Sequence, residues 1–249
     1  MLSKSELRQR AYYDRIAETY DQHFANPYAL QCRYQVFQGF LGKLPFNAQR
    51  VLDAMCGGGE NSGYFLQQGA NVTGIDISLQ QCELYRKRFP NAACLCSSIL
   101  DTGLPDESFD FAVTESLHHL PPKVDEGVYE LSRLLRPGGM LMVWEPVTGS
   151  MLDLARKIWY RLDRRFFEEN ESAIAVEELA RRHAGHLRLD RLEYGGNLAH
   201  LLVQSSMQFR IPLSWLPRYA PFLLRLEPRI QRLQGRRTAC WSAALFEKI

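Results

Sequence analysis

The chain has 249 residues, of which 46% are hydrophobic and 23% are charged, and its formal net charge is +2. This composition is typical of an ordinary globular protein that buries one substantial core. No uninterrupted apolar run approaches the roughly 18 residues that span a bilayer, and the pI of about 8.2 lies below the values above 9 typical of nucleic-acid-binding domains. We therefore expect a cytoplasmic protein without a membrane span and without a nucleic-acid partner.

The N-terminal part of the chain has helical patterns. Ser3 and Glu6 form a capping box, which predicts a helix start, and apolar residues recur after it at spacings of four. A second helical pattern covers residues 28–44. We expect residues 1–45 to form a helical cap.

Short apolar runs and helical stretches alternate in the middle of the chain. The predicted strands are residues 51–55, 72–76, 92–96, 109–114 and 140–145, and the predicted helices are 61–68, 78–89 and 123–135, the last ended by a Pro-Gly-Gly turn at 137–139. This alternation indicates a parallel sheet covered by helices on both faces. Because such sheets bind ligands beyond the carboxyl ends of their strands, we expect residues 46–146 to form the ligand-binding core.

The alternation stops after Glu145. Helical patterns over residues 150–182 and 197–235 each precede a predicted strand, at 187–194 and 238–247. We expect residues 147–249 to supply substrate-side helices and the last strands. No linker divides the chain, so residues 1–249 are predicted to form a single domain.

Cysteine and histidine show no metal-ligand pattern. The six cysteines contain no C-x-x-C pair, and we expect reduced, mostly buried thiols. His183 and His186 are three apart, but no cysteine or acidic partner set accompanies them. A metal site is therefore not predicted.

A glycine-rich segment follows the first predicted strand. Gly57, Gly58 and Gly59 lead from that strand to a helix, and glycine there permits a tight turn and close approach of a ligand to the backbone. Asp76 ends the second predicted strand, where its carboxylate can accept both ribose hydroxyls of a nucleoside. The alternatives are a purely structural turn and, for Asp76, an N-cap of the next helix, although Ser78 already offers a capping hydroxyl.

Several motifs resemble the class I, Rossmann-like S-adenosylmethionine-dependent methyltransferases, in particular methyltransferase type 11. Asp53, Gly57 and Gly59 fall on the family's D-x-G-x-G-x-G motif, although Met55 occupies its first glycine. The other matching segments are Leu104–Asp110 with L-P-x-x-x-F-D, Leu134–Gly139 with L-x-P-G-G, and Tyr13–Asp21 with the N-terminal helix that closes over the cofactor. The resemblance covers about residues 12–145.

The resemblance implies an α/β fold: a Rossmann-like, seven-stranded, mostly parallel sheet with helices on both faces, a helical N-terminal cap and helical insertions before the last strands. It implies S-adenosylmethionine as cofactor and methyl transfer to a small-molecule or lipid-like acceptor. The atom that receives the methyl group, oxygen, nitrogen or carbon, is left open.

The resemblance also implies roles for individual residues. Asp53 would hold the loop and receive the methionyl amine, directly or through water. Gly57 and Gly59 would admit the methionyl portion, and Asp76 would bind the ribose. Many relatives have an aspartate after the third strand that binds the adenine amino group; here Ser98 aligns with it, and its hydroxyl can make the same bond without charge. The full set of expected cofactor contacts is Tyr20, Asp53, Ala54, Gly57, Gly59, Asp76, Ile77, Ser98, Ile99 and Glu115.

Two residues are candidates for acid–base chemistry. His119 follows the fourth predicted strand, where an imidazole can take a proton from the acceptor. Glu145 ends the fifth. The alternative for the His118-His119 pair is turn capping and packing, and the alternative for Glu145 is a solvated carboxylate at the strand end.

Two other functions compete with this interpretation. The first is an S-adenosylmethionine-binding subunit that has lost transfer activity. The second is an NAD-dependent oxidoreductase, whose G-x-G-x-x-G fingerprint would open the chain.

The segment 208–237 combines arginines with apolar residues. It holds seven arginines and a single acid, Glu227, and aromatic and aliphatic residues are interleaved with the arginines. One interpretation is a helical cover over the substrate pocket with solvated arginines. The other is a peripheral contact with an anionic membrane or an anionic acceptor, to which the similar stretch 156–167 would contribute.

Overall fold

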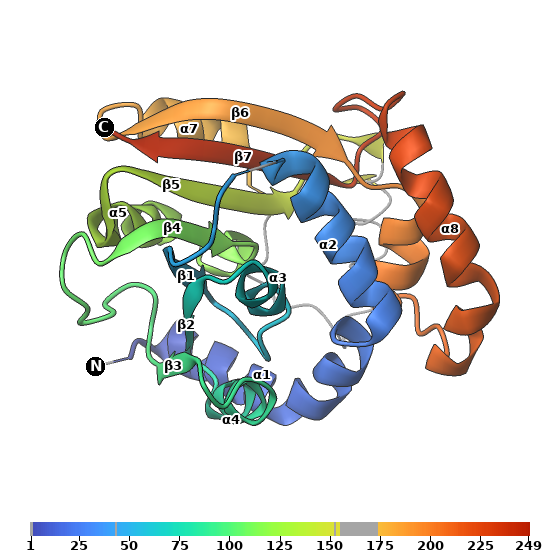
Figure 1. Cartoon of the computed structure of the whole chain (residues 1–249), viewed down its shortest axis with the longest axis horizontal. Helices are drawn as coiled ribbons and strands as arrows, with labels where there is room; N and C mark the ends of the chain where they lie inside the picture. Colours follow the sequence, from blue (N-terminus) through green and yellow to red (C-terminus); the bar gives the residue numbers. More distant parts are fainter. Residues whose placement is uncertain (1, 43, 152, 155–173) are drawn as a thin grey trace.

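The computed structural model describes residues 2–42, 44–151, 153–154 and 174–249, and these contain a seven-stranded sheet with strand order β3-β2-β1-β4-β5-β7-β6 (Figure 1). The strands are β1 (Arg50–Ala54), β2 (Asn71–Asp76), β3 (Ala93–Cys96), β4 (Phe109–Thr114), β5 (Leu135–Pro146), β6 (Leu187–Gly195) and β7 (Trp241–Lys248). The first five strands pair in parallel, whereas β7 is antiparallel to β5 and β6. The expected mostly parallel Rossmann-like sheet is confirmed.

The helices are α1 (Lys4–Phe24), α2 (Pro27–Leu41), α3 (Ser62–Gln67), α4 (Leu79–Arg88), α5 (Val124–Leu134), α7 (Val176–Arg182) and α8 (Leu216–Gln231), with short turns η1 (Leu117–His119), η2 (His200–Gln204) and η3 (Leu213–Trp215). Helices α1 to α5 agree with the sequence patterns to within a few residues. The predicted helical stretch 197–235 instead forms several shorter elements, and most of the predicted stretch 150–182 lies outside the described residues. The arginine-rich stretch 156–167 lies outside the described residues.

Strand β5 begins five residues earlier than predicted. The Pro137–Gly139 segment belongs to this strand instead of forming a free turn. Gly138 has a φ of +70°, and the register with β4 shifts between Phe109 and Phe111. The glycine absorbs this irregularity because a residue without Cβ adopts a positive φ without strain.

Apolar side chains bury both faces of the sheet. On one face, α5 and α7 pack through residues such as Leu131 and Leu179. On the other, α2 and α3 pack through Phe37 and Phe65. Burial on both faces explains the near-continuous apolar runs of the central strands.

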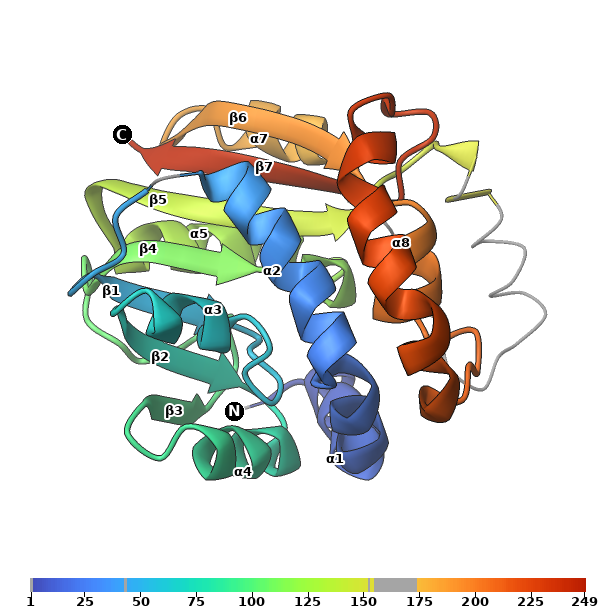
Figure 2. The same cartoon turned by 45° about the vertical axis from the view of Figure 1, so that its right-hand side comes forward.

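The N-terminal helix α1 starts at the predicted capping box, in which Ser3 and Glu6 bond each other's backbone amides. Figure 2 shows α1 and α2 at the end where β1, β2 and β4 finish, with α8 beside α2. A separate apolar cluster joins these last two helices through Cys32, Leu216 and Leu224. Among the described helices, none is both long and apolar enough to cross a membrane.

Candidate functional site

The glycine-rich loop leaves β1 in a left-handed conformation. Met55, Gly57 and Gly59 have φ values of +58°, +53° and +91°. Such values cost a non-glycine residue energy, so Met55 carries backbone strain at the position where the family has glycine. The loop thus keeps the turn that glycine would give despite the methionine.

Asp53 holds this loop from behind. The side chain is fully buried, and its carboxylate accepts hydrogen bonds from the amide and hydroxyl of Ser62 (2.9 and 2.7 Å) and from Nδ2 of Asn61 (3.2 Å). Burial raises the pKa of Asp53 to about 8, while the bonds from Ser62 and Asn61 oppose this rise. Asp53 therefore ties the start of α3 to the end of β1.

Asp76 lies at the carboxyl end of β2 and joins the loop to α4. Its Oδ2 accepts from the amide of Gly57 (2.9 Å), and its Oδ1 accepts from the amide of Ser78 (2.8 Å). Ser78 itself caps α4 through a bond to the amide of Gln81, so Asp76 is not the N-cap. Burial raises the pKa of Asp76 to about 6, against the lowering effect of the two amide bonds.

A cavity of about 690 Å³, counted with its open mouth, lies beyond these strand ends. Of the predicted residues, those that line it are Tyr20, Gly57, Asp76, Ile77, Ser98, Ile99, Glu115 and His119. The structure therefore brings most of the expected nucleoside contacts to one surface.

The remaining predicted residues are not part of the cavity lining. Asp53 lies behind the loop, and Ala54 is buried in the core beneath it. A Cβ on Gly59 would stand 2.6 Å from Phe89 and 2.9 Å from Tyr85, so this glycine permits the packing of α4 against the loop. Glu145 is buried deeper, at the end of β5.

Helix α1 covers the cavity, and two of its aspartates fasten it to the start and the end of α4. Asp14 accepts from the hydroxyl of Ser78 (2.6 Å). Asp21 pairs with Arg88, which also donates to the carbonyl of Gly58. Tyr13 and Tyr20 lie on the same side of the helix, as their spacing predicts, with ring centroids 6.0 Å apart.

Ten lining residues were not predicted as part of the site. Three of them have another role in the sequence analysis: Glu6 as part of the capping box, Tyr13 as part of the N-terminal helix motif, and Met55 as the departure from the glycine motif. The other seven are Gln9, Cys56, Glu60, Gln81, Ser97, Ser116 and Leu120. Most of them are polar residues on helices or loops without a motif of their own. Their participation depends on how α1 and α4 pack over the strand ends.

Two histidines lie after β4 and face different partners. His119 lines the cavity, and its Nε2 is 3.0 Å from the hydroxyl of Tyr13. Burial lowers the pKa of His119 well below its ordinary value, and the charge of His118 lowers it further. The imidazole of His119 is therefore neutral at pH 7.

The interpretation of Glu145 as a solvated carboxylate is wrong. This side chain is buried, and its carboxylate accepts from the amide of Leu117 (2.6 Å) and lies 2.7 Å from Nδ1 of His118. Burial of a carboxylate is compensated here by hydrogen bonds to the turn after β4. Glu145 thus fixes the segment that carries both histidines.

An ion pair lies under the cavity. Glu115, which follows β4, pairs with the buried guanidinium of Arg33 from α2, and Arg33 also donates to Oδ1 of Asn61 (2.6 Å). Burial lowers the pKa of Arg33, but the Glu115 carboxylate raises it by more, so the guanidinium stays charged. The pair and the bond to Asn61 connect α2 to the end of β4 and to the segment after the glycine-rich loop.

Among the residues that the structure describes, no group of three or more histidine, cysteine, aspartate or glutamate side chains is placed to hold a metal ion. All six cysteines are free thiols, with Cys32, Cys56 and Cys82 buried and Cys96 exposed. His183 lies 3.1 Å from His186 and 2.8 Å from Asp125.

Residues 52–143 match the family model described as a methyltransferase domain. A malonyl-[acyl-carrier protein] O-methyltransferase from Pectobacterium atrosepticum is 32% identical over 46% of this chain and 45% of its own length. The enzyme of the same name from Pseudescherichia vulneris is 29% identical over 62% of this chain and 59% of its own length. A fatty-acid O-methyltransferase from Mycolicibacterium smegmatis is 28% identical over 43% of this chain and 41% of its own. The chain spans about half the length of the curated relatives it matches.

Solved structures show the same fold. The [4+2]-cyclase SpnF superposes with a TM-score of 0.66 at 17% identity and covers 99% of this chain and 97% of its own. The 1,6-didemethyltoxoflavin-N1-methyltransferase from Burkholderia thailandensis, solved with S-adenosylhomocysteine, superposes with a TM-score of 0.59 at 16% identity, covering 100% and 91%.

The sheet order and the cavity at the carboxyl edge of the sheet define a Rossmann-like α/β protein. The match of residues 52–143 to a methyltransferase domain agrees with this fold and with the motifs of the class I S-adenosylmethionine-dependent methyltransferases. The family resemblance of the motifs is confirmed.

Proposed function

We propose that this protein is an S-adenosylmethionine-dependent methyltransferase acting on a small-molecule or lipid-like acceptor. The observation that carries the proposal is the position of Asp76, whose carboxylate lies in the cavity wall beside the glycine loop. Each carboxylate oxygen accepts one amide bond among the described residues and retains an acceptor position for one of the two ribose hydroxyls. The residues present therefore fit an adenosyl group.

When bound, S-adenosylmethionine supplies an electrophilic methyl group on a sulfonium. The main task of the protein is then to hold the acceptor in line with that group and to exclude water. Helix α1 closes one side of the cavity, and we propose that Tyr20 and Glu115 contact the cofactor from the wall nearest the loop. Asp53 supports the loop from behind, which favours an indirect contact with the methionyl amine.

We propose an acidic acceptor whose carboxylate oxygen receives the methyl group. The support comes from relatives named as O-methyltransferases of malonyl-[acyl-carrier protein] and of fatty acids. A carboxylate is already ionised at neutral pH and needs no general base. A half-buried, neutral His119 beside Tyr13 suits this reaction, because it can line and orient the acceptor without removing a proton.

The test is transfer of labelled methyl groups from S-adenosylmethionine by the full chain. Malonyl-[acyl-carrier protein] and free fatty acids of graded length serve as acceptors, and ester formation is detected by mass spectrometry. Formation of the methyl ester of either acceptor class supports the proposal. Tight cofactor binding with no transfer to any acid would favour the inactive partner subunit, and binding of NADH instead would favour an oxidoreductase.

We also propose that the protein is cytoplasmic and that α8 brings it into peripheral contact with an anionic membrane. Arg218, Phe222, Arg225, Arg229 and Arg232 are spaced along one exposed stripe of the helix. Trp215 and Leu233, at its two ends, are 54% and 89% exposed. The single acid, Glu227, is buried and accepts from the amides of Asn197 and Ala199.

The stripe therefore presents cations and apolar side chains without a compensating carboxylate from its own helix. In the described part of the chain, its four arginines form no ion pair. Guanidinium groups beside exposed aromatics suit an interface of anionic head groups.

A further inference from the structure

Helix α1 brings a carboxylate to the place where the loop after β3 lacks one. Glu6 lines the cavity and is almost fully buried. Its Oε1 accepts a hydrogen bond from the hydroxyl of Ser98, across 92 residues of sequence. The hydroxyl proton of Ser98 is donated to Glu6, so Ser98 cannot donate it to a bound adenine.

Glu6 retains one acceptor position toward the cavity. A carboxylate offers about four acceptor positions. The described residues use three of them: Ser3 donates its amide and hydroxyl to Oε2, and Ser98 donates to Oε1. The remaining position is on Oε1, the oxygen that accepts from Ser98, and both side chains line the cavity.

The Glu6 carboxylate is also charged and firmly placed. Burial raises its pKa, but the hydrogen bonds from Ser3 and Ser98 and the charge of Lys123 outweigh burial, and its pKa lies below the ordinary value. Ser98 is fixed in turn, because its Oγ accepts from the amide of Leu100 (3.1 Å).

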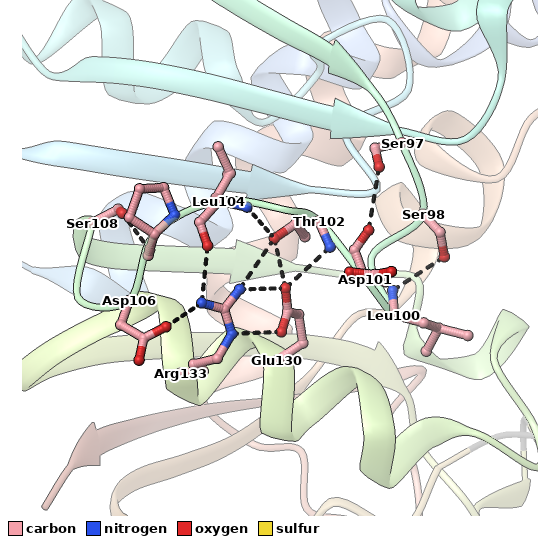
Figure 3. A network of polar contacts seen from close by, with 11 residues as sticks. Ser97, Ser98, Leu100, Asp101, Thr102, Leu104, Asp106, Ser108, Glu130 and Arg133 are labelled. Carbon is pink, nitrogen blue, oxygen red and sulfur yellow. Dashed lines mark hydrogen bonds and ion pairs between the residues drawn. The ribbon is translucent and has the colours of Figure 1, made fainter. Parts of the chain in front are cut away.

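The chain around Ser98 is anchored to α5. Figure 3 shows that Glu130 accepts from the amide and hydroxyl of Thr102, while Arg133 donates to the carbonyl of Leu104 and pairs with Glu130 and Asp106. The network holds the segment after β3 in one conformation.

We propose that Glu6 is the residue that recognises the exocyclic amino group of the adenine. The inference depends on the proposed function, because it assigns one end of the same cofactor cavity. An adenine amine is a donor, and a buried carboxylate with one open acceptor position is its complement. The helix that covers the site would then also recognise the adenine base, so the position of α1 over the cavity and the preference for one nucleoside are coupled.

The test compares S-adenosylhomocysteine with S-inosylhomocysteine, in which a carbonyl oxygen replaces the amine. Isothermal titration of the full-length wild type should show a preference for the adenosyl compound of about 10- to 100-fold. Glu6→Gln should reduce the preference to about threefold or less, since an amide can donate to the carbonyl as well as accept from the amine. Glutamine also keeps the capping box, so the helix should remain folded.

Two further variants separate recognition from structure. Glu18→Gln, which removes an exposed charge from the same helix, should keep the wild-type preference. The double variant Glu6→Gln with Ser98→Asp returns a carboxylate to the same place from the other side and should restore most of the preference. Ser98→Asp alone places two carboxylates together and should weaken binding of both compounds.

An unchanged preference in a folded Glu6→Gln variant that still binds S-adenosylhomocysteine would overturn this assignment and leave the proposed function intact. Failure of the wild type to bind S-adenosylhomocysteine would overturn both. Loss of the preference in Glu18→Gln to the same degree would also overturn the assignment, because the effect would then come from the charge of the helix.

Discussion

The backbone amide of Gly57 donates a hydrogen bond of 2.9 Å to Oδ2 of Asp76, so the loop after β1 is fastened to the acid that ends β2. This bond sets the distance between the two parts of the site that we propose to hold a nucleoside. Any change that moves the loop therefore also moves the proposed ribose acceptor.

Substitutions in the loop should differ in their effect by position. A Cβ on Gly57 would stand 3.0 Å from Oε2 of Glu60, and valine is strained at a φ of +53°. Gly57→Val should therefore weaken the binding of S-adenosylhomocysteine by at least about tenfold. Met55→Gly should relieve strain and leave the affinity within about threefold. Equal dissociation constants for the two variants in calorimetry would contradict the alignment of Gly57, and not Met55, with the glycine that the ligand needs.

Binding should depend on the protonation of Asp76. Burial raises its pKa to about 6 in the protein without ligand. Because protonation removes the charge and one acceptor position, affinity should fall as pH decreases through 6, by about tenfold between pH 7 and pH 5. Calorimetric titrations across this range measure the effect. The matched Asp76→Asn variant should bind weakly with a flat profile, and an equally steep profile in that variant would assign the dependence to another group.

Asp53 should contribute more to stability than to binding. Asp53→Ala leaves the buried amide of Ser62 and the side chain of Asn61 without their acceptor, and should lower the free energy of unfolding by about 1–3 kcal/mol. Urea unfolding followed by circular dichroism measures this change, with the exposed Asp101→Ala as control. A stable Asp53→Ala protein that has lost all cofactor binding would instead indicate direct contact with the ligand.

The stripe on α8 should bind anionic vesicles. Reversal of Arg225, Arg229 and Arg232 to glutamate should abolish co-sedimentation with phosphatidylserine-containing liposomes at low salt, and added salt should weaken binding of the wild type. The control reverses three cations at exposed positions elsewhere, Lys87, Arg181 and Arg188, which changes the net charge equally. The same loss in both triple variants, or no wild-type binding at low salt, would leave α8 as a cover with solvated arginines.

The sheet and the nucleoside end of the site could be predicted from the sequence because they depend on local patterns. Apolar runs, the glycine loop and the acid after β2 each lie within a short segment, and parallel strands bring their ends to one edge. Gly57, Asp76 and Ile99 are therefore recognisable as site residues from the sequence alone, and all three line the cavity.

Residues whose role depends on tertiary packing could not be predicted in this way. Glu6 carries an ordinary capping signature, and nothing local indicates that α1 places it against Ser98. The burial of Glu145 depends on the path of the turn that carries His118. For Gly59 the motif was found, but its proximity to Phe89 and Tyr85 emerges only when α4 is packed in place.

Titration of S-adenosylhomocysteine into the wild type and into Asp76→Ala tests the central claim most directly. The account predicts one site per chain in the wild type and an affinity at least about tenfold weaker in Asp76→Ala, since each charge-assisted bond to a ribose hydroxyl contributes about 1.5–3 kcal/mol. Circular dichroism should show the same fold in both proteins. Equal affinity in two folded proteins, or no binding by the wild type, would contradict it.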